Sequence, residues 1–213
     1  MTNELTAEII AIGSELLSGD TIDTNSAQIA RMLRGIGFEL RFISAVGDDE
    51  TLIAEVVARG LARSHVVMTT GGLGPTVDDK TRAAVSQATG RPLLFRPNLL
   101  EQIESRFGVW GKTMSDNNRT QAYTPEGALS IENQVGTAPC FILKHKQSRV
   151  ICLPGVPNEM NYLMEYKVLP YLRRSLPNIK TIKTRVLHTV GLGESVVDSR
   201  IGDLEALDNP TVG

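Results

Sequence analysis

The sequence predicts an α/β fold in which a mostly parallel sheet carries helices on both faces. In the first 70 residues, short apolar segments rich in β-branched side chains alternate with longer segments. The longer segments place apolar residues three or four positions apart, which is typical of amphipathic helices. Strands that alternate with helices in this way usually form a parallel sheet covered on both sides.

The first part of the chain contains three predicted strands, at residues 7–12, 39–46 and 65–70. A helix between the first two is capped by Asp23 or Asn25 and ends at Gly37, and apolar residues four and three positions apart mark its buried face,. A second helix begins near Leu52, after a turn that contains the acidic cluster 48–50. We interpret this cluster as solvated charge at a helix N-terminus.

The second part of the chain predicts further helices and a hairpin. The predicted helices are residues 78–89, 97–107, 115–123 and 157–176, with a kink near Pro170,. The hairpin joins strands 139–144 and 149–153. Pro177-Asn178 is the best candidate for a linker, followed by an alternating segment at 180–190, which predicts a strand, and a helix at 194–207. The predicted organisation is a main domain at 5–176 and a small α+β segment at 178–213. We interpret this segment as a truncated second domain.

Composition excludes several classes of protein. The formal net charge is −2, so there is no basic excess of the kind that binds nucleic acid,. No apolar segment is long enough for a membrane span, and the N-terminus lacks the basic start of a signal peptide,. Cys140 and Cys152 lie in apolar segments and are expected to be reduced, buried thiols,. These features favour a cytoplasmic protein that binds neither nucleic acid nor membrane.

The strongest local signal is the sequence TGGLGPTVDD at residues 70–79, which joins a predicted strand to a helix. In open α/β sheets, ligands bind at this edge. Glycines allow backbone N–H groups to approach an anion, and a helix N-terminus adds partial positive charge. A phosphate site is one interpretation, and a tight turn that needs glycine for its geometry alone is the other.

Two carboxylates, Asp78 and Asp79, adjoin this turn. Carboxylates repel a phosphate unless they bind a cation or are protonated, and oxygen ligands suit Mg²⁺ or Mn²⁺. The combination favours metal-assisted chemistry at a phosphate or pyrophosphate. The alternative is that Asp78 caps the following helix while Asp79 complements its dipole.

Three more polar loops are expected near the same edge. Glu15 lies in the loop 13–20 and is a candidate ligand or general base, or simply an exposed loop residue. Glu159 follows an apolar segment, where it either joins the site or complements a helix dipole,. Residues 133–139 form the last of these loops. The histidines are too far apart for a zinc-binding helix motif and are expected to be strand or turn residues,.

Four segments together resemble the N-terminal domain of the competence/damage-inducible protein A (CinA) family. They are GSELLSGDTIDTN at 13–25, TGGLGPTVDD at 70–79, NQVGTAP at 133–139 and LPGVPNEM at 153–160. The resemblance implies a three-layer α/β/α domain similar to the molybdopterin-binding domain of molybdenum-cofactor biosynthesis proteins. Its implied activity is divalent-metal-dependent hydrolysis of ADP-ribose to AMP and ribose 5-phosphate.

The resemblance also implies roles for particular residues. Catalysis would fall to Asp78 and Asp79, and the metal, Mg²⁺, Mn²⁺ or Co²⁺, would be bound by these two residues with Glu15 and Glu159. The residues implied to bind substrate and phosphate are Gly71, Gly72, Gly74, Thr76, Asn25 and Asn133. The implied partners are a small nucleotide and further copies of the chain in a homo-oligomer. A molybdopterin-binding, nucleotide-binding or transferase-like protein without hydrolytic turnover is the alternative. Ser14 and Cys140 depart from residues common in the family, and the chain ends before the amidohydrolase domain of longer relatives.

Overall fold

The computed structural model describes residues 5–177, 179–183, 185–207, 209, 210 and 212. They divide into two compact units, 1–182 and 183–213. The first unit begins with β1 (Leu5–Ile12), α1 (Ser14–Ser18), α2 (Thr24–Arg34), β2 (Phe38–Val46), α3 (Glu50–Arg63), β3 (Val66–Thr70) and α4 (Thr81–Thr89). It continues with β4 (Leu93–Phe95), α5 (Pro97–Val109), the 3₁₀ helix η1 (Asp116–Ala122), β5 (Tyr123–Pro125) and β6 (Leu129–Ile131). It is completed by β7 (Cys140–His145), β8 (Ser148–Leu153), α6 (Pro157–Leu163), the π-helix η2 (Met164–Val168) and α7 (Leu169–Ser175).

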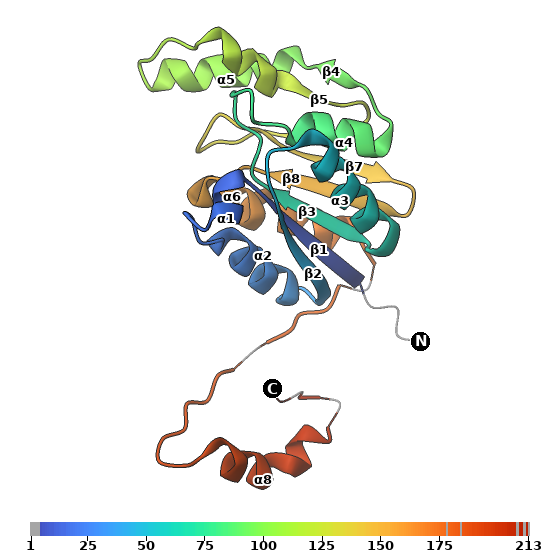
Figure 1. The fold of residues 1–213 in the computed structure, drawn as a ribbon, viewed down its shortest axis with the longest axis vertical. Coiled ribbons are helices and arrows are strands. Elements are labelled where there is room, and N and C mark those ends of the chain that lie inside the picture. The colour runs from blue at the N-terminus through green and yellow to red at the C-terminus, as the bar shows by residue number, and fades with distance from the viewer. Residues whose placement is uncertain (1–4, 178, 184, 208, 211, 213) are drawn as a thin grey trace. The chain divides into compact units, whose positions relative to one another are not determined.

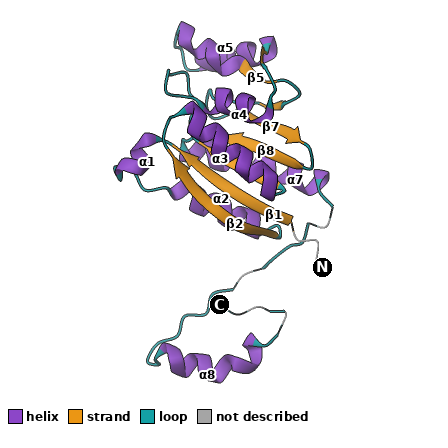
Figure 2. Cartoon of the chain, turned by 45° about the vertical axis from the view of Figure 1, so that its right-hand side comes forward, coloured by secondary structure: helices purple, strands orange, loops and turns teal. Residues whose placement is uncertain are grey.

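The described strands of the first unit form a six-stranded sheet in the order β2-β1-β3-β8-β7-β6, with a separate pair, β4-β5. The pairs β1–β2, β1–β3 and β3–β8 are parallel, whereas β7 is antiparallel to both neighbours. Helices cover both faces, as Figures 1 and 2 show. The predicted α/β class and mostly parallel sheet are therefore confirmed.

Each face of the sheet has its own apolar core. Ala7 and Ile9 of β1 pack in one core with residues of α2, α6 and α7, whereas Ile10 and Ile12 pack in the other with residues of α3 and α4. This alternation follows from the two-residue period of a strand. Cys140 and Cys152 are free, buried and assigned to opposite cores, which confirms the predicted buried thiols.

Several short elements escaped the sequence analysis. The helix α1 occupies the expected loop 13–20, and β4, β5 and β6 each contain three residues, too few for a periodic pattern. Residues 115–123 contain a 3₁₀ helix and the start of β5. The expected helix 157–176 is broken by a π-helical turn just before Pro170, where the missing N–H of proline disturbs the regular ladder,.

The expected strand at 180–190 is wrong. Its described residues, 180–183 and 185–190, have no regular structure, because an alternating segment forms a strand only when another strand pairs with it,. Ile179 instead packs against the first core, and the N–H of Ile182 donates to the carbonyl of Gly35 at 3.3 Å. Asn178, half of the expected linker, lies outside the described residues. In the second unit, the helix α8 (Glu194–Glu205) has no buried residue.

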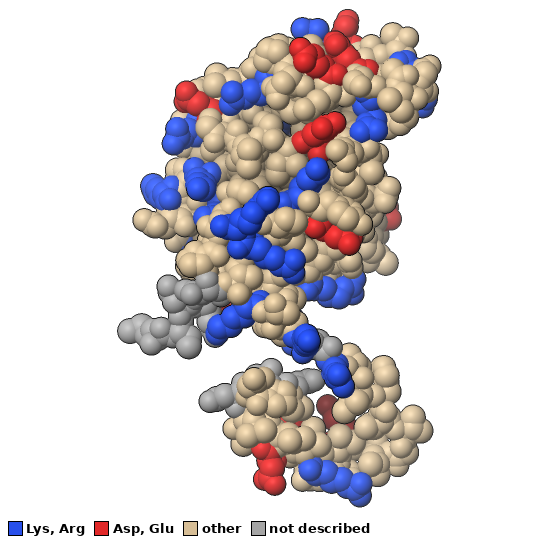
Figure 3. Space-filling model, turned by 180° about the vertical axis from the view of Figure 1, so that it is seen from behind, with Lys and Arg blue, Asp and Glu red and all other residues tan. Residues whose placement is uncertain are grey.

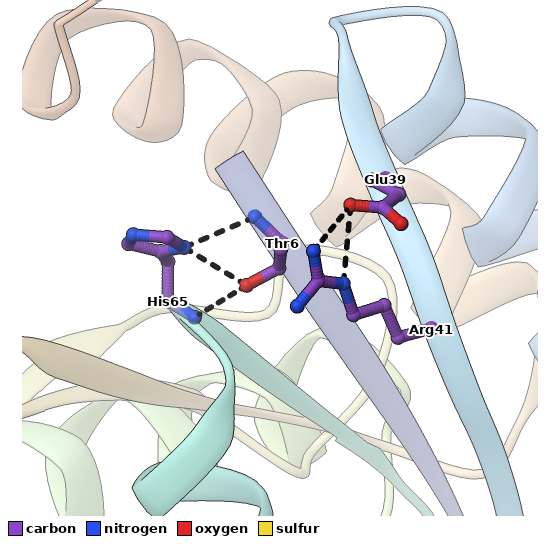
Figure 4. Close-up of polar contacts among 4 residues, drawn as sticks. All are labelled: Thr6, Glu39, Arg41 and His65. Atoms are coloured by element: carbon purple, nitrogen blue, oxygen red, sulfur yellow. Dashed lines mark hydrogen bonds and ion pairs between the residues drawn. The ribbon is translucent and has the colours of Figure 1, made fainter. Parts of the chain in front are cut away.

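The N-terminal end of the sheet is fixed by His65. Its Nδ1 accepts from the backbone N–H of Thr6 at 3.1 Å and lies 2.9 Å from the Thr6 hydroxyl (Figure 4). The predicted strand or turn role of His65 is thereby confirmed. Beside it, Arg41 and Glu39 form an exposed ion pair on the edge strand β2.

Basic side chains are distributed unevenly over the surface. Seen from behind, the first unit carries a band of Lys and Arg side chains (Figure 3). The last turns of α2 and α7 contain arginines, where they complement the negative ends of the helix dipoles,. No helix in the described part of the chain is long and apolar enough to cross a membrane.

Candidate functional site

A cleft of about 420 Å³ lies where β1, β3 and β8 end. The predicted residues that line it are Glu15, Gly71, Gly72, Gly74, Thr76, Asp78, Asp79 and Glu159. They meet there because the carboxyl ends of neighbouring parallel strands share one edge of the sheet. Asn25 and Asn133 do not line the cleft, but both form hydrogen bonds with residues that do.

The glycine turn needs glycine for its geometry. Gly71 has φ of 107°, and a Cβ atom there would lie 2.1 Å from the carbonyl oxygen of Ile12. A Cβ at Gly72 would lie 2.3 Å from Oγ1 of Thr81, whose hydroxyl donates to the carbonyl of Gly71 at 2.8 Å. The interpretation that this turn needs glycine for its geometry is therefore confirmed. It does not exclude a ligand, because no group in the described residues accepts from the N–H of Gly72 or Leu73.

Asp79 closes the turn. Its Oδ1 accepts from the N–H of Gly74 at 2.7 Å, and its Oδ2 accepts from the N–H and hydroxyl of Thr76 at 2.8 and 2.6 Å. These bonds use both carboxylate oxygens within the loop. Asp79 is thus positioned to shape the cleft wall, and a cation would have to share an oxygen that already accepts hydrogen bonds.

Asp78 has different surroundings. Its side chain is exposed, and the Thr76 side chain, followed by its own backbone N–H, lowers the pKa of its carboxyl. The helix α4 begins at Thr81 with Lys80 as its cap, so the expected start at residue 78 is wrong. The alternative role of Asp78 as the helix cap is wrong for the same reason, since residues 75–80 are occupied by the turn that Asp79 closes.

Arg82 is a buried cation behind the turn that the sequence analysis missed. Only 6% of the residue is exposed, and its guanidinium donates to the carbonyls of Leu73 and Gly74 at 2.7 and 2.6 Å. Burial lowers its pKa to about 10, while the nearby Asp79 opposes the shift. No pattern distinguishes this arginine from an exposed basic residue at the start of a helix.

Asn25 joins three loops. Its Nδ2 donates to the Thr70 hydroxyl at 2.9 Å and to the carbonyl of Gly155 at 2.8 Å, and the Thr70 hydroxyl donates to the carbonyl of Pro154 at 3.1 Å. Asn25 therefore ties α2 to the end of β3 and to the loop after β8. Its observed contacts are with the protein, so its predicted contact with substrate stays a prediction.

Asp48 is a second residue that was missed. Its Oδ2 accepts from the N–H of Ser14 at 2.9 Å, while its own N–H donates to the Ser14 hydroxyl at 3.2 Å. Asp48 lines the cleft together with Glu15, whereas Asp49 caps α3 by accepting from the N–H of Leu52 at 2.9 Å. Interpreting the whole cluster 48–50 as helix-terminal charge was thus wrong for its first member.

Glu159 lies in the first turn of α6 and contacts the loop that follows β6. Its carboxylate accepts a short hydrogen bond from Nδ2 of Asn133, which also donates to the carbonyl of Ala138 at 3.1 Å. Partial burial raises the pKa of Glu159, and the bond from Asn133 opposes the shift. Gly136 packs directly on the carboxylate, where a Cβ atom would lie 2.0 Å from Oε2.

The described residues fit a cation only if the ligand supplies some of its oxygens. No group of three or more His, Cys, Asp or Glu residues in the described part of the chain is arranged to hold a metal. Mg²⁺, however, commonly binds one or two carboxylates together with substrate phosphates and water. Asp78, which is ionised and exposed, suits this kind of site best. The roles of Asp79, Glu15 and Glu159 as metal ligands stay predictions.

Comparison with known proteins identifies relatives of the chain. Residues 8–174 match the family described as "Probable molybdopterin binding domain". A competence-damage inducible protein of Halothermothrix orenii is 44% identical over 97% of this chain and 49% of its own length. A Clostridium botulinum protein of the same name is 43% identical over 97% of this chain and 50% of its own length. The chain thus spans about half the length of these curated relatives.

Solved structures show the same fold. CinA of Thermoplasma acidophilum, a protein of unknown function, superposes with a TM-score of 0.71 and 34% identity over 79% of this chain and 97% of its own. The molybdopterin biosynthesis enzyme MoaB of Thermus thermophilus superposes with a TM-score of 0.53 and 20% identity over 78% and 92%. At that identity the second likeness supports the fold alone.

Proposed function

The chain belongs to the CinA family and contains its molybdopterin-binding-like domain, and from this premise we propose that it hydrolyses a nucleoside diphosphate sugar. ADP-ribose is the proposed substrate, with AMP and ribose 5-phosphate as products. The observation that carries the proposal is the juxtaposition of a glycine turn with an exposed, ionised Asp78 in one cleft.

The turn provides the features that a diphosphate needs. Gly72 and Leu73 line the cleft, and we propose as donors their N–H groups, which bond to no acceptor in the described part of the chain, while the start of α4 adds partial positive charge,. Arg82 is too deeply buried, with its donors directed at the carbonyls of Leu73 and Gly74, to serve as the main phosphate ligand. The carboxylates of the cleft would repel a diphosphate in the absence of a counter-ion.

A divalent cation, Mg²⁺, Mn²⁺ or Co²⁺, would balance this charge and lower the pKa of a bound water. Asp78 is the residue we propose to hold it, with Glu15, Asp79 and Glu159 as further candidates. Partial burial raises the pKa of Glu159, which favours its protonated form more than in an exposed carboxyl,. Asp79 would keep the turn in the conformation that receives the phosphate.

The test is incubation of the purified chain with ADP-ribose and each of the three cations, followed by chromatography for AMP. We expect AMP to form only when a cation is present, and chelation by EDTA to stop the reaction. Equal rates with and without EDTA would reject the metal-dependent mechanism. Absence of AMP under all conditions would reject the hydrolase proposal.

A second candidate function is binding of molybdopterin or a nucleotide without turnover. Two observations favour it: the description of the matched family, and the engagement of both Asp79 oxygens within the turn. Calorimetric titration distinguishes the two functions, because tight molybdopterin binding without AMP formation would support the second one.

We further propose that the chain acts in the cytoplasm as a homo-oligomer that binds neither nucleic acid nor membranes. Two free, buried cysteines suit a reducing compartment, and the net charge of −2 gives no general attraction to polyanions,. Sedimentation of the purified chain would measure its oligomeric state directly.

A further inference from the structure

Gln121 presents a buried and unsatisfied acceptor at the cleft. Among the described residues of segment 91–128, it is the one that lines the cleft. Its side chain reaches from η1 to the glycine turn, where Nε2 donates to the carbonyl of Leu73 at 3.3 Å. Only 1% of the residue is exposed, and its Oε1 has no hydrogen-bond partner among the described residues.

The chemistry of the neighbouring carbonyl fixes the orientation of this amide. Leu73 O only accepts, and it receives a second hydrogen bond from Arg82 at 2.7 Å. Rotating the amide by 180° would place two acceptor oxygens against each other. Gln121 must therefore direct its NH₂ group to Leu73 and its oxygen elsewhere.

A buried amide oxygen without a donor is energetically costly, and most such groups have a partner. The missing partner must be a donor, which excludes a phosphate oxygen. An ionised carboxylate only accepts hydrogen bonds and cannot satisfy it either. A ligand that reaches from the glycine turn towards Gln121 could supply the donor from a group next to its phosphates.

We propose that Gln121 is a specificity-determining residue that accepts a hydrogen bond from a neutral N–H or O–H group of the ligand. This inference rests on the proposed function, in which the donor is the adenine amino group or the 2-hydroxyl of one of the two riboses. A site built around such a bond discriminates strongly against analogues that lack the donor, because the protein acceptor is then left unpaired.

The experiment compares wild type with Gln121→Met, which keeps the side-chain length but removes both polar atoms. Gln147→Met, in the exposed turn between β7 and β8, is the matched control. Calorimetry with Mg²⁺ measures binding of α,β-methylene ADP-ribose, its hypoxanthine analogue and its 2′-deoxy and 2″-deoxy analogues. We expect Gln121→Met to weaken binding of the parent compound by about 10-fold or more. The analogue that lacks the critical donor should bind both proteins equally.

Two outcomes would overturn the inference. If Gln121→Met weakens the binding of all four compounds by the same factor, Gln121 only positions the turn at Leu73. If it weakens the binding of none, Oε1 of Gln121 does not contact the ligand. Should Gln121→Met fail to fold, soaked wild-type crystals provide the second measurement. We expect a ligand nitrogen or oxygen within hydrogen-bond distance of Oε1, and a water molecule in its place would overturn the inference.

Failure of the proposed function has a different signature. In that case wild type binds none of the four ADP-ribose compounds, and the same variants are titrated with AMP and with 6-hydroxymethylpterin phosphate. Weaker binding of either probe by Gln121→Met alone would support the role of Gln121 in a different ligand class. Unchanged binding, or no binding by wild type, would overturn it.

Discussion

Asp79 and Thr76 are joined by two hydrogen bonds to a single carboxylate oxygen, from the backbone N–H at 2.8 Å and from the hydroxyl at 2.6 Å. This arrangement curls the chain back on itself and leaves the adjacent Asp78 exposed. Two neighbouring aspartates that are equivalent in sequence are therefore unequal in structure. One organises the turn, and the other is available to a ligand.

The pair Asp78→Asn and Asp79→Asn separates these roles. Asp79→Asn replaces one acceptor oxygen by an NH₂ group that faces N–H donors, so we expect the free energy of unfolding to fall by about 1–3 kcal/mol and turnover to be lost. Asp78→Asn should abolish metal-dependent turnover and lower thermal stability less than Asp79→Asn does, because the Asp78 side chain is exposed and only the interactions that lower its pKa are lost,.

Thermal denaturation and AMP release measure the two effects. Wild-type activity in Asp78→Asn would contradict the role of this residue in holding the cation. Undiminished stability in Asp79→Asn would show that the hydrogen bonds to Gly74 and Thr76 contribute little.

Substituting Gly71 by alanine should destabilise the fold strongly. The added methyl group would collide with the carbonyl of Ile12, and φ of 107° is unfavourable for any residue with a Cβ atom. We expect a loss of at least about 3 kcal/mol. The control is Gly108→Ala in α5, where no described atom beyond the neighbouring backbone of the helix lies within 4 Å of the new Cβ, and a gain of about 0.5–1 kcal/mol is expected,. Chemical denaturation of both variants tests the contrast, which equal losses would refute.

Removing the amide of Asn133 should raise the pKa of Glu159 further. Burial already raises this pKa, and the bond from Asn133 is the opposing contribution. In Asn133→Ala, NMR titration of the Glu159 side-chain carboxyl carbon should therefore show a midpoint above that of wild type. Asn158→Ala, an exposed neighbour in α6, should leave the midpoint unchanged. A lower midpoint in Asn133→Ala would contradict the assigned hydrogen bond.

The same shift makes stability depend on pH. Because the folded state raises the pKa of Glu159, it binds the proton more tightly than the unfolded chain does. Above this pKa the partly buried, ionised carboxylate lowers the free energy of unfolding. This loss disappears as the pH falls through the pKa of Glu159 in the folded state. The stability deficit of Asn133→Ala relative to wild type should accordingly shrink from neutral towards acidic pH. Urea denaturation at a series of pH values measures it.

Both cysteines should resist alkylation in the native protein. Burial raises the pKa of Cys140 well above its ordinary value and that of Cys152 to about 12, so neither forms the reactive thiolate at pH 8,. Iodoacetamide at pH 8 should label neither thiol within the time that labels both in urea. Mass spectrometry counts the adducts, and rapid native labelling at either position would contradict the buried location.

Sequence patterns predicted the parts of the fold that depend on long, periodic segments. The strands β1, β3 and β8 and the helices α2 and α3 follow directly from apolar spacing. By contrast, β4 and β5 have three residues each and pair only with each other, so no local pattern indicates them. At 180–190 the error is the reverse: the alternating pattern predicts a strand, but none forms in the described residues of this segment because no other strand pairs with them.

The candidate site divides in the same way. Its glycines and carboxylates could be found because they cluster in the sequence at the ends of strands. Asp48 and Gln121 could not, because each reaches the cleft through a contact between distant segments. Arg82 could not, because its burial behind the turn depends on the path of the chain from Leu73 to α4. The distinct roles of Asp78 and Asp79 also depend on the path of the backbone between residues 74 and 79, which composition does not specify.

The backbones of the loops after β3 and β8 touch, since a Cβ atom at Gly155 would lie 3.3 Å from Cα of Gly71. Asn25 also bonds to the end of β3 and to the loop after β8, so reshaping one loop would displace the other. A combinatorial library intended to change ligand preference should therefore randomise the two loops jointly. If only one loop were randomised, most variants would not pack against the unchanged loop.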